Sequence, residues 1–174
     1  MRKTRDYVYI GLMAALIAVL SQIMLPMPSG VPVTLQTFAV ALAGFVLGAR
    51  QGVAAVGVYL ALGAVGVPVF TGMMGGFGRL FGVTGGFLFG FLALAFFCGL
   101  SSKRENKLAS ALISVPGLVI CHLMGTAYYA FIAKTGFAAA FLAVSLPYIL
   151  KDILFIAGAW AVSRSVRRAL KSFS

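Results

Sequence analysis

The sequence has 174 residues, of which 61% are hydrophobic, and its mean hydropathy is +1.05. This composition excludes a water-soluble globular domain, and the length excludes a second domain beside a membrane domain. Fourteen Lys and Arg residues against three Asp and Glu residues give a net charge of +11, which often indicates a phosphate-rich partner. Where these charges lie along the chain decides what they mean.

Six apolar stretches are long enough, or nearly so, to cross a bilayer. A helix needs about 20 residues to span the hydrocarbon, and lipid offers no water to unpaired backbone groups. We therefore expect an all-α integral membrane protein with six transmembrane helices in one domain, residues 1–174. The expected spans are 7–25, 31–48, 52–67, 83–100, 108–133 and 140–163.

The basic residues are distributed very unevenly around these spans. With the N-terminus inside the cell, eleven of the fourteen are cytoplasmic: Arg2, Lys3, Arg5, Arg50, Lys103, Arg104, Lys107, Arg164, Arg167, Arg168 and Lys171. This asymmetry predicts that both termini are cytoplasmic. It also explains the net charge without nucleic acid, because the charges flank spans in short clusters. The small size and the strong bias indicate the plasma membrane of a prokaryote.

The first span carries small residues in two interleaved rows. Gly11 and Ala15 are four residues apart, as are Ala14 and Ala18, so each pair shares a helix face. Small residues let another helix approach closely in lipid. These faces serve either internal packing or docking to another membrane subunit.

Polar residues follow a loop rich in proline and glycine at 26–32, which we expect outside the cell. Thr34 either caps the second helix or faces a ligand, and Gln36 can offer a ligand both donors and an acceptor. Tyr59, near the end of the third span, is either an aromatic residue of the membrane interface or the wall of a pocket.

The connection 71–86 is rich in glycine but lacks the charge and serine of a flexible linker. Glycine here permits close backbone approach, as in a lid or a segment that lines a cavity. Gly76, Gly78 and Gly82 have the wrong spacing for a dinucleotide fingerprint. The sequence also has no GxxxxGK[ST] motif, so it cannot hydrolyse ATP by that route.

Two charges lie inside the last span, where each costs roughly 2.5 to 3.5 kcal/mol. Lys151 and Asp152 are adjacent, about 100° apart on a helix, so we do not expect an ideal ion pair between them. Arg79, on the outer side, and Lys151 could hold an anion while Asp152 accepts hydrogen bonds from ligand N–H groups. Alternatives for Asp152 are a buried bridge to Lys151 or Arg79, or proton coupling.

The remaining chemistry-bearing residues are few. His122 is either a hydrogen-bonded structural residue or a ligand or proton contact. Cys98 and Cys121 lie in predicted spans and indicate neither a disulfide nor a metal site. With one histidine, one intramembrane acid and no nucleophile–base pair, we expect no enzyme and no cofactor.

Four blocks in order resemble the BioY proteins, the biotin-binding substrate (S) components of energy-coupling factor (ECF) transporters. The blocks are VPVTLQTF at 31–38, AGFVLGARQG at 43–52, GVPVF at 66–70 and GVTGGFLFGF at 82–91. The similarity extends over roughly residues 30–155. Val83 replaces a proline that many relatives have in the last block.

The resemblance implies a six-helix S component that binds extracellular biotin with high affinity as its transported substrate. It implies two kinds of partner, a transmembrane coupling protein and two cytoplasmic ATPase subunits, with the small-residue face of the first span as the docking face. It also implies that Asp152 contacts the ureido ring of biotin. The alternatives are a solo proton-coupled transporter using Asp152 or His122, and an S component for another small vitamin.

Overall fold

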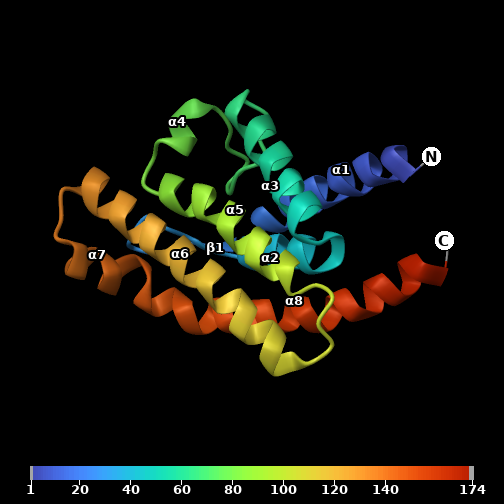
Figure 1. The fold of residues 1–174 in the computed structure, drawn as a ribbon. Helices are drawn as coiled ribbons and strands as arrows, with labels where there is room; N and C mark the ends of the chain where they lie inside the picture. Colours follow the sequence, from blue (N-terminus) through green and yellow to red (C-terminus); the bar gives the residue numbers. More distant parts are fainter. Residues whose placement is uncertain (1, 173–174) are drawn as a thin grey trace.

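The computed structural model describes residues 2–172 and consists mainly of helices of very different lengths (Figure 1). The elements are α1 (Arg2–Ser21), β1 (Met24–Leu25), β2 (Val33–Thr34), α2 (Gln36–Leu47), α3 (Ala49–Ala64), α4 (Phe77–Leu80), α5 (Gly85–Leu100), α6 (Lys107–Ala133), α7 (Phe137–Val144) and α8 (Leu146–Ser172). The side chains of Arg2, Lys3 and Lys171, three of the predicted cytoplasmic cations, lie outside the described part.

Helix α2 is the centre of the bundle. It packs against α1, α3, α5 and α8, and most of its side chains are buried. A helix that is apolar on all sides is stable only when protein or lipid surrounds it completely. At 12 residues α2 is about 18 Å long, shorter than the hydrocarbon layer. The surrounding helices, rather than its own length, therefore allow it to lie at membrane depth.

Three described helices are long and apolar enough to cross a membrane by themselves, within 4–21, 107–133 and 146–170. Helices α2 and α5 are apolar but shorter. The start of α1 and the end of α8 lie on the same side of the molecule, whereas α4 and α7 lie towards the opposite side (Figure 1). The chain is thus mostly helical, as predicted.

Three of the predicted spans differ from the structure in an informative way. The span predicted at 7–25 ends as a helix at Ser21, because Met24–Leu25 pairs antiparallel with Val33–Thr34 and closes a hairpin around the loop 26–32. For the same reason α2 begins at Gln36 rather than at 31.

The span predicted at 140–163 is divided into two helices. Helix α7 ends at Val144, and α8 begins at Leu146. Between them Ser145 leaves helical geometry, with φ −122° and ψ −54°. Pro147 has no N–H to continue the hydrogen-bond ladder of α7, so a new helix starts here. The hydropathy pattern does not reveal this break, because the residues on both sides of Ser145 and Pro147 are apolar and the two together read as one continuous span.

Helices α5 and α6 pack closely because glycines lie at their contact. A Cβ atom added at Gly90 would come within 2.7 Å of Cys121 Cα, and one at Gly86 within 2.5 Å of the Met124 carbonyl oxygen. Neither neighbour is a flexible side-chain end. Close approach of this kind is how dispersion contacts hold membrane helices together.

Replacing Gly90 by alanine is therefore expected to destabilise the protein by about 1–3 kcal/mol, because the methyl group must separate α5 from α6. Thermal unfolding in detergent, followed by tryptophan fluorescence or light scattering, measures the change. Gly57→Ala is the matched control, because a Cβ there meets no atom within 4 Å. Equal melting temperatures for the two variants would contradict the tight-packing account.

Candidate functional site

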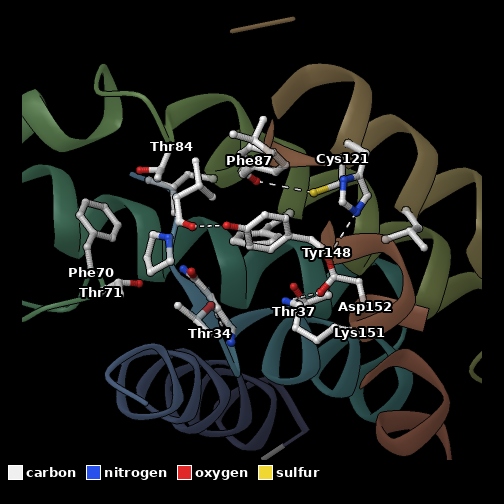
Figure 2. A pocket seen from close by; sticks show the side chains of 18 of the residues that line it. Thr34, Thr37, Phe70, Thr71, Thr84, Phe87, Cys121, Tyr148, Lys151 and Asp152 are labelled. Carbon is white, nitrogen blue, oxygen red and sulfur yellow. Dashed lines mark hydrogen bonds and ion pairs between the residues drawn. The ribbon is translucent and has the colours of Figure 1, made fainter. Parts of the chain in front are cut away.

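A cavity of about 60 Å³ lies where the hairpin, the start of α2, α5, α6, α8 and the α3–α5 connection meet (Figure 2). Its walls are mainly apolar and aromatic, with polar side chains at several points. The lining residues are Val31, Pro32, Thr34, Gln36, Thr37, Phe70, Thr71, Arg79, Thr84, Phe87, Leu88, Phe91, Leu118, Cys121, His122, Val144, Tyr148, Lys151 and Asp152. This mixture of apolar walls and a few polar groups is typical of small-molecule sites, but ligand pockets usually measure about 300–1,000 Å³, so this cavity must widen to admit a ligand.

Asp152 is the buried acid of this cavity, with a relative exposure of 6%. Lys151 Nζ lies 2.6 Å from its Oδ1 atom, and His122 Nε2 lies 3.2 Å from its Oδ2 atom. The pairing of Lys151 with Asp152 corrects the expectation that neighbours on one helix would not pair. The long lysine side chain reaches back to the carboxylate, and its ammonium group lies 5.0 Å from the centroid of the Phe155 ring.

Both oxygens of the carboxylate have a charged or polar neighbour. Oδ1 is buried beside the Lys151 ammonium group, and Oδ2 lies beside His122. Thr37, from α2, lies beside Lys151 and Asp152 (Figure 2). A carboxylate has about four lone-pair sites, so Asp152, which lines the cavity, can still accept hydrogen bonds from a ligand.

His122 belongs to a chain of polar side chains that connects α6, the junction between α7 and α8, and α8. Its Nδ1 atom lies 3.0 Å from Ser145 Oγ, which in turn lies 2.6 Å from Thr126 Oγ1. All three side chains are buried. The break at Ser145 thus places a hydroxyl where it orients the histidine, and the histidine orients Asp152. His122 is thus a hydrogen-bonded structural residue, and it also lines the cavity.

The polar start of α2 forms another part of the wall. Gln36 is buried and donates a hydrogen bond from Nε2 to the hydroxyl oxygen of Tyr59, at 2.6 Å. Thr34 does not occupy the N-cap, which is Leu35, but its hydroxyl oxygen accepts from the Gln36 backbone N–H at 3.3 Å. Thr34 and Gln36 both line the cavity.

The position of Tyr59 corrects the idea that it forms a pocket wall. Its side chain has 0% exposure and is not among the lining residues. It packs edge-on against Phe70, with ring centroids 5.5 Å apart, and holds Gln36 from behind. The sequence alone does not separate these two positions, because both suit an aromatic side chain near the end of an apolar helix.

Arg79 lines the cavity from α4, within the glycine-rich connection. No ion pair to Arg79 is present in the described part of the chain, so its charge is available. Thr71 and Thr84, from the same connection, lie on one side of the cavity, and Lys151 and Asp152 lie on the other (Figure 2). Thr34 and Tyr148 lie between these two polar regions (Figure 2).

Two tyrosines that the sequence analysis did not single out hold the loop 26–32 in place. The Tyr148 hydroxyl donates to the Val31 carbonyl and lies 3.2 Å from Ser29 Oγ. The Tyr129 hydroxyl donates to the Ser29 carbonyl at 3.1 Å. The loop is thereby attached to α6 and α8 over the cavity. In the sequence, the feature that comes closest to indicating this role is that Tyr148 lies next to Pro147 and close to Asp152.

The small-residue rows of α1 face in different directions. Ala14 is buried, with 2% exposure, and packs in the core, which removes it from any docking face. Gly11 and Ala15 are exposed, and Ala18 is half-buried. A Cβ at Gly11 would meet no atom within 4 Å. The row of Gly11 and Ala15 is therefore the one open to another helix.

These features define a membrane-embedded helical protein with a small-molecule cavity that is polar at two ends. The chain matches the model of the BioY family over residues 1–172, and so it belongs to the BioY family, as its sequence blocks predicted.

Several known proteins are similar over most of their length. The probable biotin transporter BioY of Pyrococcus horikoshii is 35% identical, over 95% of this chain and 98% of its own. The biotin transporter BioY of Thermotoga maritima is 43% identical, over 70% of this chain and 72% of its own. The crystal structure of the S component for biotin from an ECF-type ABC transporter aligns with a TM-score of 0.87 and 26% identity, covering 96% of this chain and 93% of that one.

Proposed function

We propose that this chain is the biotin-binding S component of an ECF-type importer, which captures extracellular biotin with high affinity and delivers it through an ATP-driven complex. The observation that carries the proposal is Asp152, a buried carboxylate that His122 and Lys151 orient and that lines the cavity. The names of the relatives, and the S component of closely similar fold, support biotin as the substrate.

The chemistry of biotin matches the two polar regions of the cavity. Its ureido ring has two N–H donors, which a carboxylate accepts in strong, charge-assisted hydrogen bonds. Its fused ring and side chain are apolar and fit against Phe87, Leu88 and Phe91. Its carboxylate needs a cation, and Arg79 supplies one from the glycine-rich connection. Thr34 and Gln36 complete the polar wall.

The segments 26–32 and 71–84 act as the lid in this mechanism. Both contribute residues to the cavity wall, and the first is held by Tyr129 and Tyr148. Biotin enters when these segments move outward, and their return excludes water, which strengthens the polar contacts inside.

Isothermal titration of the purified full chain in detergent tests the function. We expect one-to-one biotin binding, loss of binding for an analogue without the ureido ring, and no competition by other vitamins. Folded protein that binds no biotin, or that binds another vitamin more tightly, would overturn the assignment.

Arg79→Gln is expected to weaken the binding of biotin by about 10- to 100-fold, because a charge-assisted contact with the ligand carboxylate is lost. Binding of biotinamide, which lacks that negative charge, should change little. Titration of both ligands against wild type and variant measures the difference. An equal loss for both ligands would show that Arg79 acts on the fold of the connection and not on the carboxylate.

We also propose one membrane domain, residues 1–174, with α1, α2, α3, α5, α6 and α8 as six spans and both termini in the cytoplasm of a prokaryotic cell. The clustered basic residues and the common side of the two helix ends support this orientation. Single cysteines at Ser102 and Thr135, placed in a Cys98→Ala, Cys121→Ala background, should react with a membrane-impermeant thiol reagent from opposite sides. Labelling of both from outside would contradict the orientation.

The partners follow from the same assignment. A transmembrane coupling protein docks on the open face of α1, and two cytoplasmic ATPase subunits supply the energy, since the chain has no nucleotide-binding motif of its own. Similarity to an S component of an ECF-type ABC transporter supports this arrangement.

A further inference from the structure

A basic hollow lies further along α6 and α8, away from the cavity that contains Asp152. Its volume is about 400 Å³, and it contains five basic side chains and one acidic side chain. The lining residues are Phe45, Ser102, Lys103, Arg104, Glu105, Trp160, Ser163, Arg164, Arg167 and Arg168. None of these basic side chains lines the cavity proposed to bind biotin.

One arginine of the hollow is held in a defined position. The Arg164 guanidinium donates to the Glu105 carbonyl oxygen at 2.7 Å and lies 5.0 Å from the centroid of the Trp160 ring. The Glu105 carboxylate is 4.0 Å away and its side chain is 91% exposed, so it neutralises Arg164 only weakly. Lys107 Nζ lies 5.8 Å from the same ring. Two cations thus lie close to the Trp160 ring.

An apolar groove of about 330 Å³ continues from this hollow between α6 and α8. The two share Phe45 and Trp160 in their walls. The groove is lined by Phe45, Lys107, Ser110, Ala111, Ser114, Val115, Leu118, Ile153, Ile156, Ala157, Trp160 and Ala161. Helices α6 and α8 do not pack closely along their length, whereas α6 packs on α5 and α8 on α2, which leaves the groove open.

We infer that this hollow and groove bind one anionic phospholipid, with the phosphate among Arg164, Arg167 and Arg168 and an acyl chain in the groove. The charge complements a phosphate headgroup, and basic pockets between membrane helices are known sites for such headgroups. The adjoining groove distinguishes a lipid from free phosphate, because free phosphate has no apolar portion to fill it. A lipid here fills the gap between α6 and α8, the two helices that carry His122 and Asp152.

Native mass spectrometry of the full chain, released from detergent in the presence of phosphatidylglycerol or phosphatidylcholine, tests the inference. We expect one retained phosphatidylglycerol, little phosphatidylcholine, and no displacement by an equal concentration of glycerol phosphate. The Arg164→Gln, Arg167→Gln double variant should bind phosphatidylglycerol about 30-fold more weakly. Each lost cation is worth about 1 kcal/mol towards an anionic headgroup, and about 1.4 kcal/mol corresponds to a tenfold change in affinity.

Two comparisons make the result decisive. The Arg50→Gln, Lys134→Gln double variant loses the same charge at exposed positions outside the hollow and should retain phosphatidylglycerol. Ala157→Phe narrows the groove without changing charge and should also reduce retention. Equal binding of both lipids, equal retention by the two charge variants, or displacement by glycerol phosphate would overturn the lipid assignment. Melting temperatures and elution volumes confirm that each variant is folded.

Discussion

Asp152→Asn is expected to weaken biotin binding by about 100- to 1,000-fold, the largest effect of any single change in the cavity. The substitution removes the negative charge that accepts the ureido N–H groups, and the new amide directs N–H donors of its own into the site. It also leaves the Lys151 ammonium group, which lies 2.6 Å from the carboxylate, without its partner. Titration of the purified full chain with biotin measures the loss.

A matched change separates recognition from stability. Asp6→Asn alters the same residue type on α1, outside the biotin cavity, and should leave affinity unchanged. The double variant Lys151→Gln, Asp152→Asn removes both charges of the pair and should fold as well as wild type while still binding biotin poorly. Wild-type affinity in Asp152→Asn would show that the ureido ring binds elsewhere.

Ala15→Trp is expected to reduce ATP-driven biotin uptake at least about tenfold, because the bulky side chain overpacks the face of α1 that docks on the coupling protein. Biotin binding by the isolated chain should remain, since Ala15 is exposed and does not line the cavity. Uptake by cells that contain all subunits, together with co-purification of the coupling protein, measures the effect.

Ala127→Trp is the control for this prediction, because Ala127 is also an exposed alanine but lies on α6. It should support normal uptake and normal complex assembly. Equal uptake in the two variants would show that the row of Gly11 and Ala15 is not the docking face. Loss of biotin binding in Ala15→Trp would mean that α1 supports the cavity rather than the complex.

Several features of the site were predictable from sequence because they are energetically costly. An acid inside an apolar span is expensive unless it has a role, and this alone singled out Asp152. The polar residues Thr34 and Gln36 at the start of an apolar helix, and the glycine-rich connection with Arg79, were unusual in the same way. All four residues line one cavity in the structure.

Other features depended on orientation, which no residue pattern specifies. Ala14 and Ala15 are adjacent and chemically identical, yet one is buried and the other exposed, because the position of α2 and α3 decides which face of α1 is covered. Tyr59 lies behind Gln36 rather than in the cavity for the same kind of reason. Lys151 reaches Asp152 through side-chain torsions that a helical wheel ignores.

The amino-acid sequence was enough to identify a helical membrane protein of the BioY family with an acid inside its last long helix. Hydropathy, charge and family blocks are properties of the chain, and folding does not alter them. The folded arrangement was needed to see which polar groups meet, that the last predicted span is broken at Ser145, which contacts His122, and that a groove next to a basic hollow lies between α6 and α8. These depend on distances between segments far apart in the chain, which close packing of α2 and α5 sets.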